Sequence, residues 1–110
     1  MIKLTDKQQL LEFIKKSRGQ TVYIFKHSTR CAVSAMVYSE FEQFAMEFSD
    51  VPTALILVIE HREVSNLLEE VSGITHQSPQ VIQYVDEKVV WNASHHNIDQ
   101  DTLKRQINNP

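Results

Sequence analysis

A single cysteine, Cys31, is the residue of this 110-residue sequence best suited to covalent chemistry. It follows a β-branched and aromatic run at residues 21–25 and precedes apolar residues at helical spacing over residues 35–48. The first run is typical of a buried strand and the second of a helix with a broad apolar face. We therefore expect Cys31 at or inside the first helical turn, where free backbone N–H groups and the helix dipole stabilise an anion. A thiolate is such an anion and is the nucleophilic form of cysteine.

The neighbours of Cys31 strengthen this interpretation. Arg30 adds positive charge, and Ser34 adds a hydrogen-bond donor three residues on. The alternative is a structural cysteine, because free cysteine is among the most buried residue types. The polar and cationic approach over residues 26–30 argues against that alternative.

Composition bounds the class of protein. The apolar share of 42% and the charged share of 23% are those of an ordinary globular protein, and residues 1–110 are expected to form a single domain. A formal charge of -3 gives no electrostatic reason to expect nucleic acid or an anionic membrane as a partner. One cysteine cannot form an intramolecular disulfide, which favours a reducing, cytoplasmic location.

Hydrophobic patterning predicts alternating helices and strands. Thr5 has the spacing of an N-cap residue for the first helix, and Asn97 has it for the last. Residues 86–87 form a candidate hairpin turn, and Gly73 is a plausible helix end. The predicted order is helix, strand, helix, strand, helix, strand, strand, helix. This αβαβαββα order belongs to the α/β class, with its first two strands parallel across a right-handed crossover.

This order, with a cysteine opening the first crossover helix and a proline before the third strand, resembles the thioredoxin-like fold. That resemblance implies a four-stranded mixed sheet flanked by helices. The segments at residues 26–28, 78–80 and 90–95, together with Cys31 and Ser34, are similar to the monothiol bacilliredoxin (YtxJ-like) family of low-GC Gram-positive bacteria. The similarity runs along nearly the whole chain.

The family resemblance implies an oxidoreductase of redox homeostasis that removes bacillithiol, a cysteinyl-glucosaminyl-malate thiol, from S-bacillithiolated proteins. Cys31 would be the attacking thiol. Ser34 stands where a dithiol relative has its resolving cysteine, which makes a CxxS motif and a monothiol enzyme. Ala32 departs from the proline expected in this family, and it adds one backbone N–H near the sulfur.

The resemblance also implies where substrate binds. Pro79 would be the cis-proline that faces the active cysteine, and the backbone of Ser78 would pair with an extended client segment. An ordinary trans turn is the alternative for this proline. His95 and His96 would lie beside the small-thiol site, where they could hold a carboxylate such as that of malate. With Arg30, these are the expected substrate-binding residues.

The expected partners are S-bacillithiolated client proteins, a low-molecular-weight thiol and a reductase. Bacillithiol would serve as co-substrate, with no bound cofactor. The five histidines could be read as metal ligands, but the sequence has no zinc-site spacing, so we expect no metal. Two other functions fit less well: a thioredoxin-fold binding or adaptor module with a modifiable cysteine, and a one-cysteine peroxidase.

Overall fold

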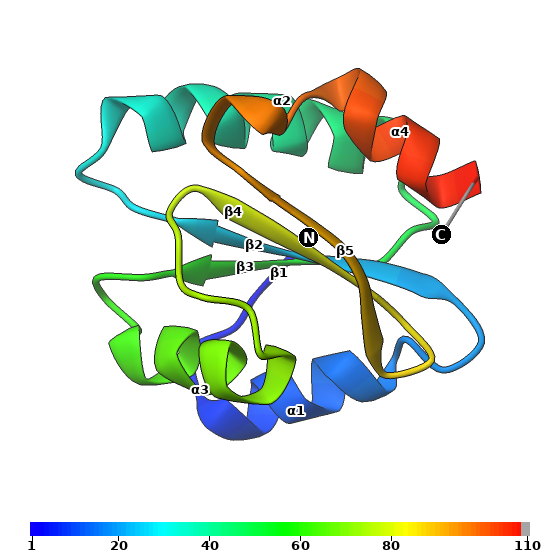
Figure 1. Cartoon of the computed structure of the whole chain (residues 1–110), viewed down its shortest axis with the longest axis horizontal. Coiled ribbons are helices and arrows are strands. Elements are labelled where there is room, and N and C mark those ends of the chain that lie inside the picture. Colours follow the sequence, from blue (N-terminus) through cyan, green and yellow to red (C-terminus); the bar gives the residue numbers. More distant parts are fainter. Residues whose placement is uncertain (109–110) are drawn as a thin grey trace.

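A five-stranded sheet lies between two pairs of helices in the computed structural model, which describes residues 1–108 apart from the Asn108 side chain (Figure 1). The strand order is β1-β3-β2-β4-β5. In chain order the elements are β1 (Ile2–Lys3), α1 (Lys7–Lys15), β2 (Thr21–His27), α2 (Ala32–Glu47), β3 (Thr53–Leu57), α3 (Arg62–Ser72), β4 (Gln80–Val85), β5 (Lys88–Ser94), a 3₁₀ turn η1 (His95–Asn97) and α4 (Gln100–Asn108).

The sequence predicts four strands, and this number is wrong by one. The additional strand, β1, pairs in parallel with β3 through Ile2 and Ala54 at the edge of the sheet. Two residues are too short for a periodic signal, so only the tertiary pairing reveals the strand. The other four strands follow the predicted order. β2 pairs in parallel with β3 and antiparallel with β4, and β4 pairs antiparallel with β5, which makes the sheet mixed.

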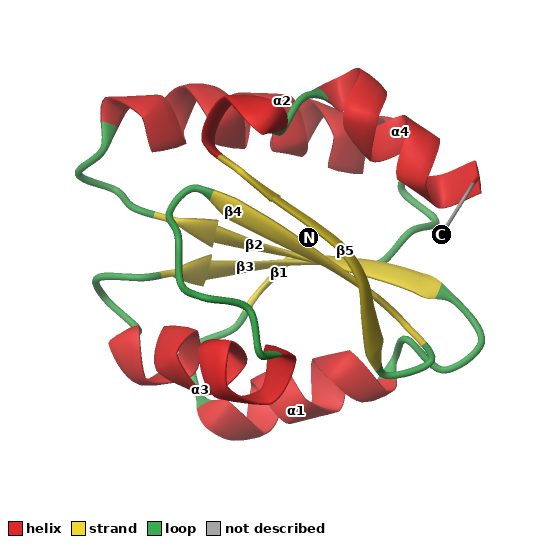
Figure 2. Ribbon diagram, in the orientation of Figure 1, coloured by secondary structure: helices red, strands yellow, loops and turns green. Residues whose placement is uncertain are grey.

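Helices cover both faces of the sheet. Helices α2 and α4 lie on one face, and α1 and α3 lie on the other (Figure 2). The central strand β2 supplies both apolar cores because its side chains alternate between the faces. Val22 and Ile24 pack in the cluster with α1 and α3, whereas Tyr23 and Phe25 pack in the cluster with α2 and α4. β2 is therefore packed on both faces, and its carboxyl end is a rigid support for the loop that leads to α2.

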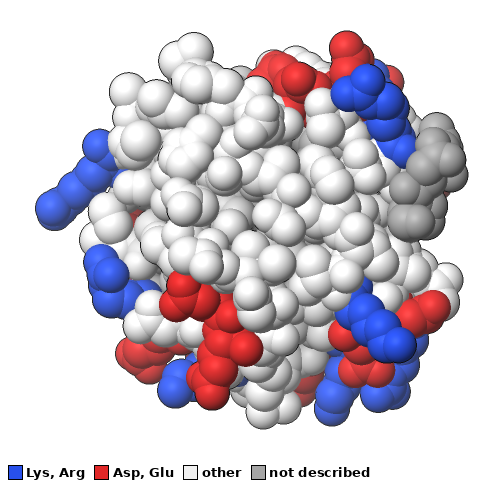
Figure 3. Space-filling view, viewed as in Figure 1, with Lys and Arg blue, Asp and Glu red and all other residues white. Residues whose placement is uncertain are grey.

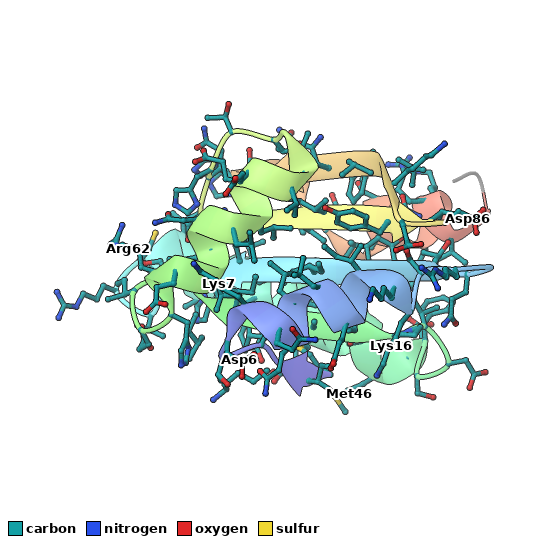
Figure 4. All side chains as sticks on the ribbon, turned by 90° about the horizontal axis from the view of Figure 1, so that it is seen from below. Asp6, Lys7, Lys16, Met46, Arg62 and Asp86 are labelled. Carbon is teal, nitrogen blue, oxygen red and sulfur yellow. The ribbon has the colours of Figure 1, made fainter. Side chains whose placement is uncertain are left out.

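Local capping explains the limits of the helices. Asp6, not Thr5, is the N-cap of α1, and its carboxylate accepts a hydrogen bond from the Gln9 N–H at 2.8 Å. The expected cap was therefore one residue early. Figure 4 shows Asp6 at the start of α1 and Lys16 at its other end, on the same side of the molecule as Asp86. Gly73 ends α3 in the left-handed conformation, with φ of 72°, as the sequence predicts.

The C-terminal part of the fold is a hairpin followed by a short helix. Asp86 and Glu87 form the predicted turn, both with positive φ. The expected N-cap Asn97 lies instead at the end of η1. The carboxylate of Asp99 accepts from the Thr102 N–H at 2.8 Å, so Asp99 caps the last helix two residues later than expected. Within residues 1–108, none of the helices combines the length and apolarity needed to cross a lipid bilayer.

Candidate active site

Three segments that carry predicted site residues meet at one end of the sheet. Lys26 of β2 is paired with Gln80 of β4, and Gln80 is paired with Ser94 of β5, so the three form one row across the strands. One step beyond this row, the His95 N–H donates to the Pro79 carbonyl at 3.0 Å. The row therefore brings together the loop after β2, the proline before β4 and the histidines after β5. In Figure 1 this is the end toward which the arrow of β2 points.

Cys31 occupies the N-cap position of α2, as the sequence predicts. Its backbone is extended, with φ of -113° and ψ of 120°, and its side chain is half-buried and free of any disulfide. The Cys31 N–H donates to the Ser28 carbonyl at 3.2 Å, and the Cys31 carbonyl accepts the first helical bond from Ala35 at 3.1 Å. Cys31 thus directly precedes a helix of 16 residues, and its side chain makes no hydrogen bond with the first N–H groups of that helix.

Ser34 is buried and points away from solvent. Its hydroxyl oxygen accepts from the Ser28 N–H at 3.0 Å and lies 2.8 Å from Nδ1 of His27. Among the described residues this hydroxyl has no hydrogen bond with Cys31, so the geometry differs from the expected donation to the thiolate. Ser34 instead fastens the cysteine loop to β2 and to the first turn of α2.

His27 is a site residue whose role sequence reasoning missed. Its ring stacks on Tyr38 of α2, with ring centroids 4.8 Å apart and an interplanar angle of 16°. Its carbonyl accepts from the Val58 N–H at 3.0 Å. Burial lowers the pKa of His27, with Glu60 opposing that shift, so the ring is neutral at pH 7. A neutral ring protonated on Nε2 accepts the Ser34 hydroxyl proton at Nδ1.

The polar segment before Cys31, residues 26–30, is less exposed in the structure than its residue types suggest. Lys26 is fully buried, and His27 is 9% exposed, because both still belong to β2. Only residues 28–30 form the loop itself. Their charge and polarity therefore do not by themselves argue against a buried cysteine, and it is the N-cap position of the half-exposed Cys31 that does so.

Ser78 and Pro79 are joined by a cis peptide bond, the geometry that the family resemblance implied. Pro79 is buried beside the end of β2, while Ser78 is half-buried. The hydroxyl oxygen of Ser78 is shielded from solvent and has no hydrogen-bond partner within residues 1–108. The segment therefore carries one buried, uncommitted hydroxyl, and the strand register places it next to the end of β2.

The remaining predicted residues are at the surface. The side chains of Arg30, His95 and His96 are exposed and make no hydrogen bond or ion pair with another residue of the described chain. His95 has a positive φ of 55°, where the chain turns from β5 into η1. In Figure 3 charged groups lie around the rim, and the middle of the visible face, which β5 crosses in Figure 1, carries none. A partner on this face meets polar and apolar groups rather than fixed charge.

The histidines do not gather into a metal site. In the described part of the chain, no three His, Cys, Asp or Glu side chains lie close enough together to hold an ion. The groups placed around the site are a thiol, hydroxyls, a neutral imidazole and backbone amides. Such groups suit exchange of a sulfur–sulfur bond at the cysteine.

The fold and the N-cap cysteine are those of the thioredoxin-like class of thiol oxidoreductases. A protein assigned as an oxidoreductase with a thioredoxin fold is 30% identical to this chain, with a TM-score of 0.86 over 94% of this chain and 90% of that one. The family model described as Monothiol bacilliredoxin BrxC matches residues 2–103, and the chain belongs to this family.

Thioredoxins of other organisms share the fold at lower identity. Fasciola hepatica thioredoxin is 18% identical, with a TM-score of 0.80 over 98% of this chain and 97% of that one. Mitochondrial thioredoxin 3 from Saccharomyces cerevisiae is 17% identical, with a TM-score of 0.77 over 100% of this chain and 95% of that one. These likenesses establish the backbone arrangement alone.

Proposed function

We propose that this protein removes bacillithiol from S-bacillithiolated proteins through Cys31, as a monothiol thiol-disulfide oxidoreductase. The observation that carries the proposal is the half-exposed thiol of Cys31 at the N-cap of α2, without a second cysteine in the chain. Membership of the monothiol bacilliredoxin family supports bacillithiol as the small thiol. A reducing, cytoplasmic compartment suits a protein that must keep this one thiol free.

In the first step the Cys31 thiolate attacks the bacillithiol sulfur of the client's mixed disulfide. The client–bacillithiol bond breaks, the client leaves as a thiolate, and a Cys31–bacillithiol disulfide forms. One thiolate is consumed and one is released, so the step needs no oxidant and no net proton. The unpaired N–H groups of the first turn of α2 stabilise the negative charge on the attacking sulfur.

In the second step another bacillithiol thiolate attacks the bacillithiol sulfur held on Cys31. Cys31 leaves as a thiolate, and the disulfide of bacillithiol is released for a separate reductase. Ser34 cannot take the place of this second thiol, since it has no sulfur. Its two contacts hold the cysteine loop in shape through both steps.

The surroundings of Cys31 supply candidate binding groups. The backbone of Ser78 before Pro79 is offered to an extended client segment, as in sheet augmentation. His95 and His96, exposed after β5, are offered to the carboxylates of bacillithiol, together with Arg30 on the cysteine loop. Each of these four contacts is part of the proposal.

The test uses a client protein that carries one bacillithiol-capped cysteine. Intact-mass spectrometry should show loss of the cap from the client and gain of one bacillithiol on Cys31. Turnover should follow when free bacillithiol is added. Cys31→Ser should abolish both events, because its hydroxyl is a far weaker nucleophile than a thiolate.

A matched control is Ser39→Ala, an exposed change on the same helix. It should leave the rate unchanged. A Cys31→Ser protein that still removes the cap would overturn the proposal. An adduct that forms on the wild-type protein but is never released by added thiol would instead point to an adaptor with a modifiable cysteine.

A further inference from the structure

Lys26 is a buried charged residue that the proposed chemistry does not use. It precedes His27 on β2, and strand alternation turns the two side chains to opposite faces. His27 stacks on Tyr38 of α2, so Lys26 faces the layer of α1 and α3, which Figure 4 views from outside. Its relative exposure is 0%. The lysine therefore lies under the sheet end that carries the active site, on the side away from the helix of Cys31.

The ammonium group of Lys26 has no hydrogen-bond partner in the described part of the chain. Burial lowers its pKa to about 8, and the negative charge of Glu69 opposes that shift. An unpaired buried ammonium destabilises a folded protein, and a straight apolar side chain of similar length would avoid this cost. Such a residue is a candidate for a role outside stability.

Polar groups of α3 and the following loop, on the same side of the sheet as Lys26, form one cluster. Ser65 and Glu69 lie one turn apart on α3, and the Glu69 carboxylate accepts from the backbone N–H of His76 at 2.7 Å. The Ser65 hydroxyl lies 3.5 Å from Nδ1 of His76. Partial burial and the charges of Lys26 and Arg62 lower the pKa of His76, while Glu69 acts the other way. α1 contributes only apolar buried residues to this face.

The same loop is held from its other side by β4. Gln80, the strand partner of Lys26, donates from Nε2 to the Thr75 carbonyl at 3.0 Å and accepts from the Gln77 N–H at 3.4 Å. Gln80 is 1% exposed, so the strand end of each bond is shielded from water. The loop that ends at Pro79 is thus anchored at Glu69, whose charge acts on Lys26, and at Gln80, the strand partner of Lys26.

We propose that Lys26 is a positioning residue for client binding: its buried ammonium holds the Glu69 carboxylate against the His76 N–H and so fixes the loop that presents Ser78 and Pro79. This inference rests on the proposed function for the identity of the client. The ammonium is buried, whereas the Glu69 carboxylate is half-buried and makes no ion pair with it in the described chain, so the attraction acts at longer range than a direct contact. Loss of the positive charge frees the carboxylate and loosens the loop without touching Cys31.

The test compares Lys26→Met, Glu69→Gln and the exposed control Lys88→Met. Amide hydrogen exchange at His76 should be about tenfold faster in the first two variants and unchanged in the third. KM for the bacillithiol-capped client should rise about tenfold in the first two, while the rate of Cys31 with a small aromatic disulfide stays within about twofold. The thermal midpoint of Lys26→Met should equal or exceed that of the wild type, because an unpaired charge has been removed.

The pH profile gives a readout that a purely structural lysine would not move. KM for the client should rise in the wild type as pH passes the value of about 8 at which Lys26 loses its charge, and this rise should vanish in Lys26→Met.

Unchanged exchange at His76 in both Lys26→Met and Glu69→Gln overturns the positioning role, whether or not the protein turns over the capped client. Faster exchange with unchanged client KM overturns the link to binding. If the wild-type protein shows no turnover of the capped client, the proposed function fails, and exchange at His76 still decides the role of Lys26.

Discussion

Removal of the Ser34 hydroxyl should weaken the fold more than its size suggests. This buried oxygen bonds both the Ser28 N–H at 3.0 Å and the His27 ring at 2.8 Å. Ser34→Ala leaves both partners without an acceptor or donor from the protein. A buried group left unsatisfied costs about 1–3 kcal/mol, and the half-buried Ser28 N–H, which water can reach, costs about 0.5–1 kcal/mol. We expect a loss of about 2 kcal/mol in the free energy of unfolding.

Urea unfolding followed by far-UV circular dichroism measures this loss, and thermal unfolding should show a fall of about 8 °C for a chain of this length. The control is Ser39→Ala, on the same helix but exposed, which should change stability by no more than about 0.5 kcal/mol. Equal stability of the two variants would refute the assignment of Ser34 as the fastener of the cysteine loop. This loss is large, since the whole free energy of unfolding of a domain is only about 5–15 kcal/mol.

Two further predictions concern stability. Burial lowers the pKa of His27 and of His76, so between pH 7 and about 5 the unfolded chain binds more protons than the folded one. The free energy of unfolding therefore falls as pH falls. His27→Asn should make that fall shallower, and an unchanged pH dependence of urea unfolding would contradict this. The Tyr23 hydroxyl donates to the Leu103 carbonyl at 3.0 Å, so Tyr23→Phe should cost about 1 kcal/mol at constant urea m-value. A denaturation midpoint unchanged by this substitution would show that the hydrogen bond makes no net contribution to stability.

Local patterns in the sequence predict much of this fold. The strand over residues 21–25, the helix that Cys31 opens and the glycine that ends α3 are all found, because each depends on residues within one or two turns of the chain. The hairpin at residues 86–87 is found for the same reason. Short-range sterics and capping suffice for these features.

Features that depend on tertiary pairing are not accessible in this way. β1 has two residues and exists only through its pairing with β3. Lys26 and His27 read as a polar approach to the cysteine, yet β2 extends through both and buries them between layers. The partners of Ser34 are likewise fixed by which strand end lies under the first turn of α2. These contacts come from the packing of distant segments, which periodicity does not encode.

The row of Lys26, Gln80 and Ser94 has a mechanical consequence for how this protein tolerates change. The spacing between the cysteine loop, the proline and the histidines is set by strands that hydrogen bonds hold about 4.8 Å apart, an arrangement much stiffer than a set of free loops. Substitutions that destabilise an outer helix should therefore lower the melting temperature well before they alter the distance between the Cys31 sulfur and the sulfur that it attacks.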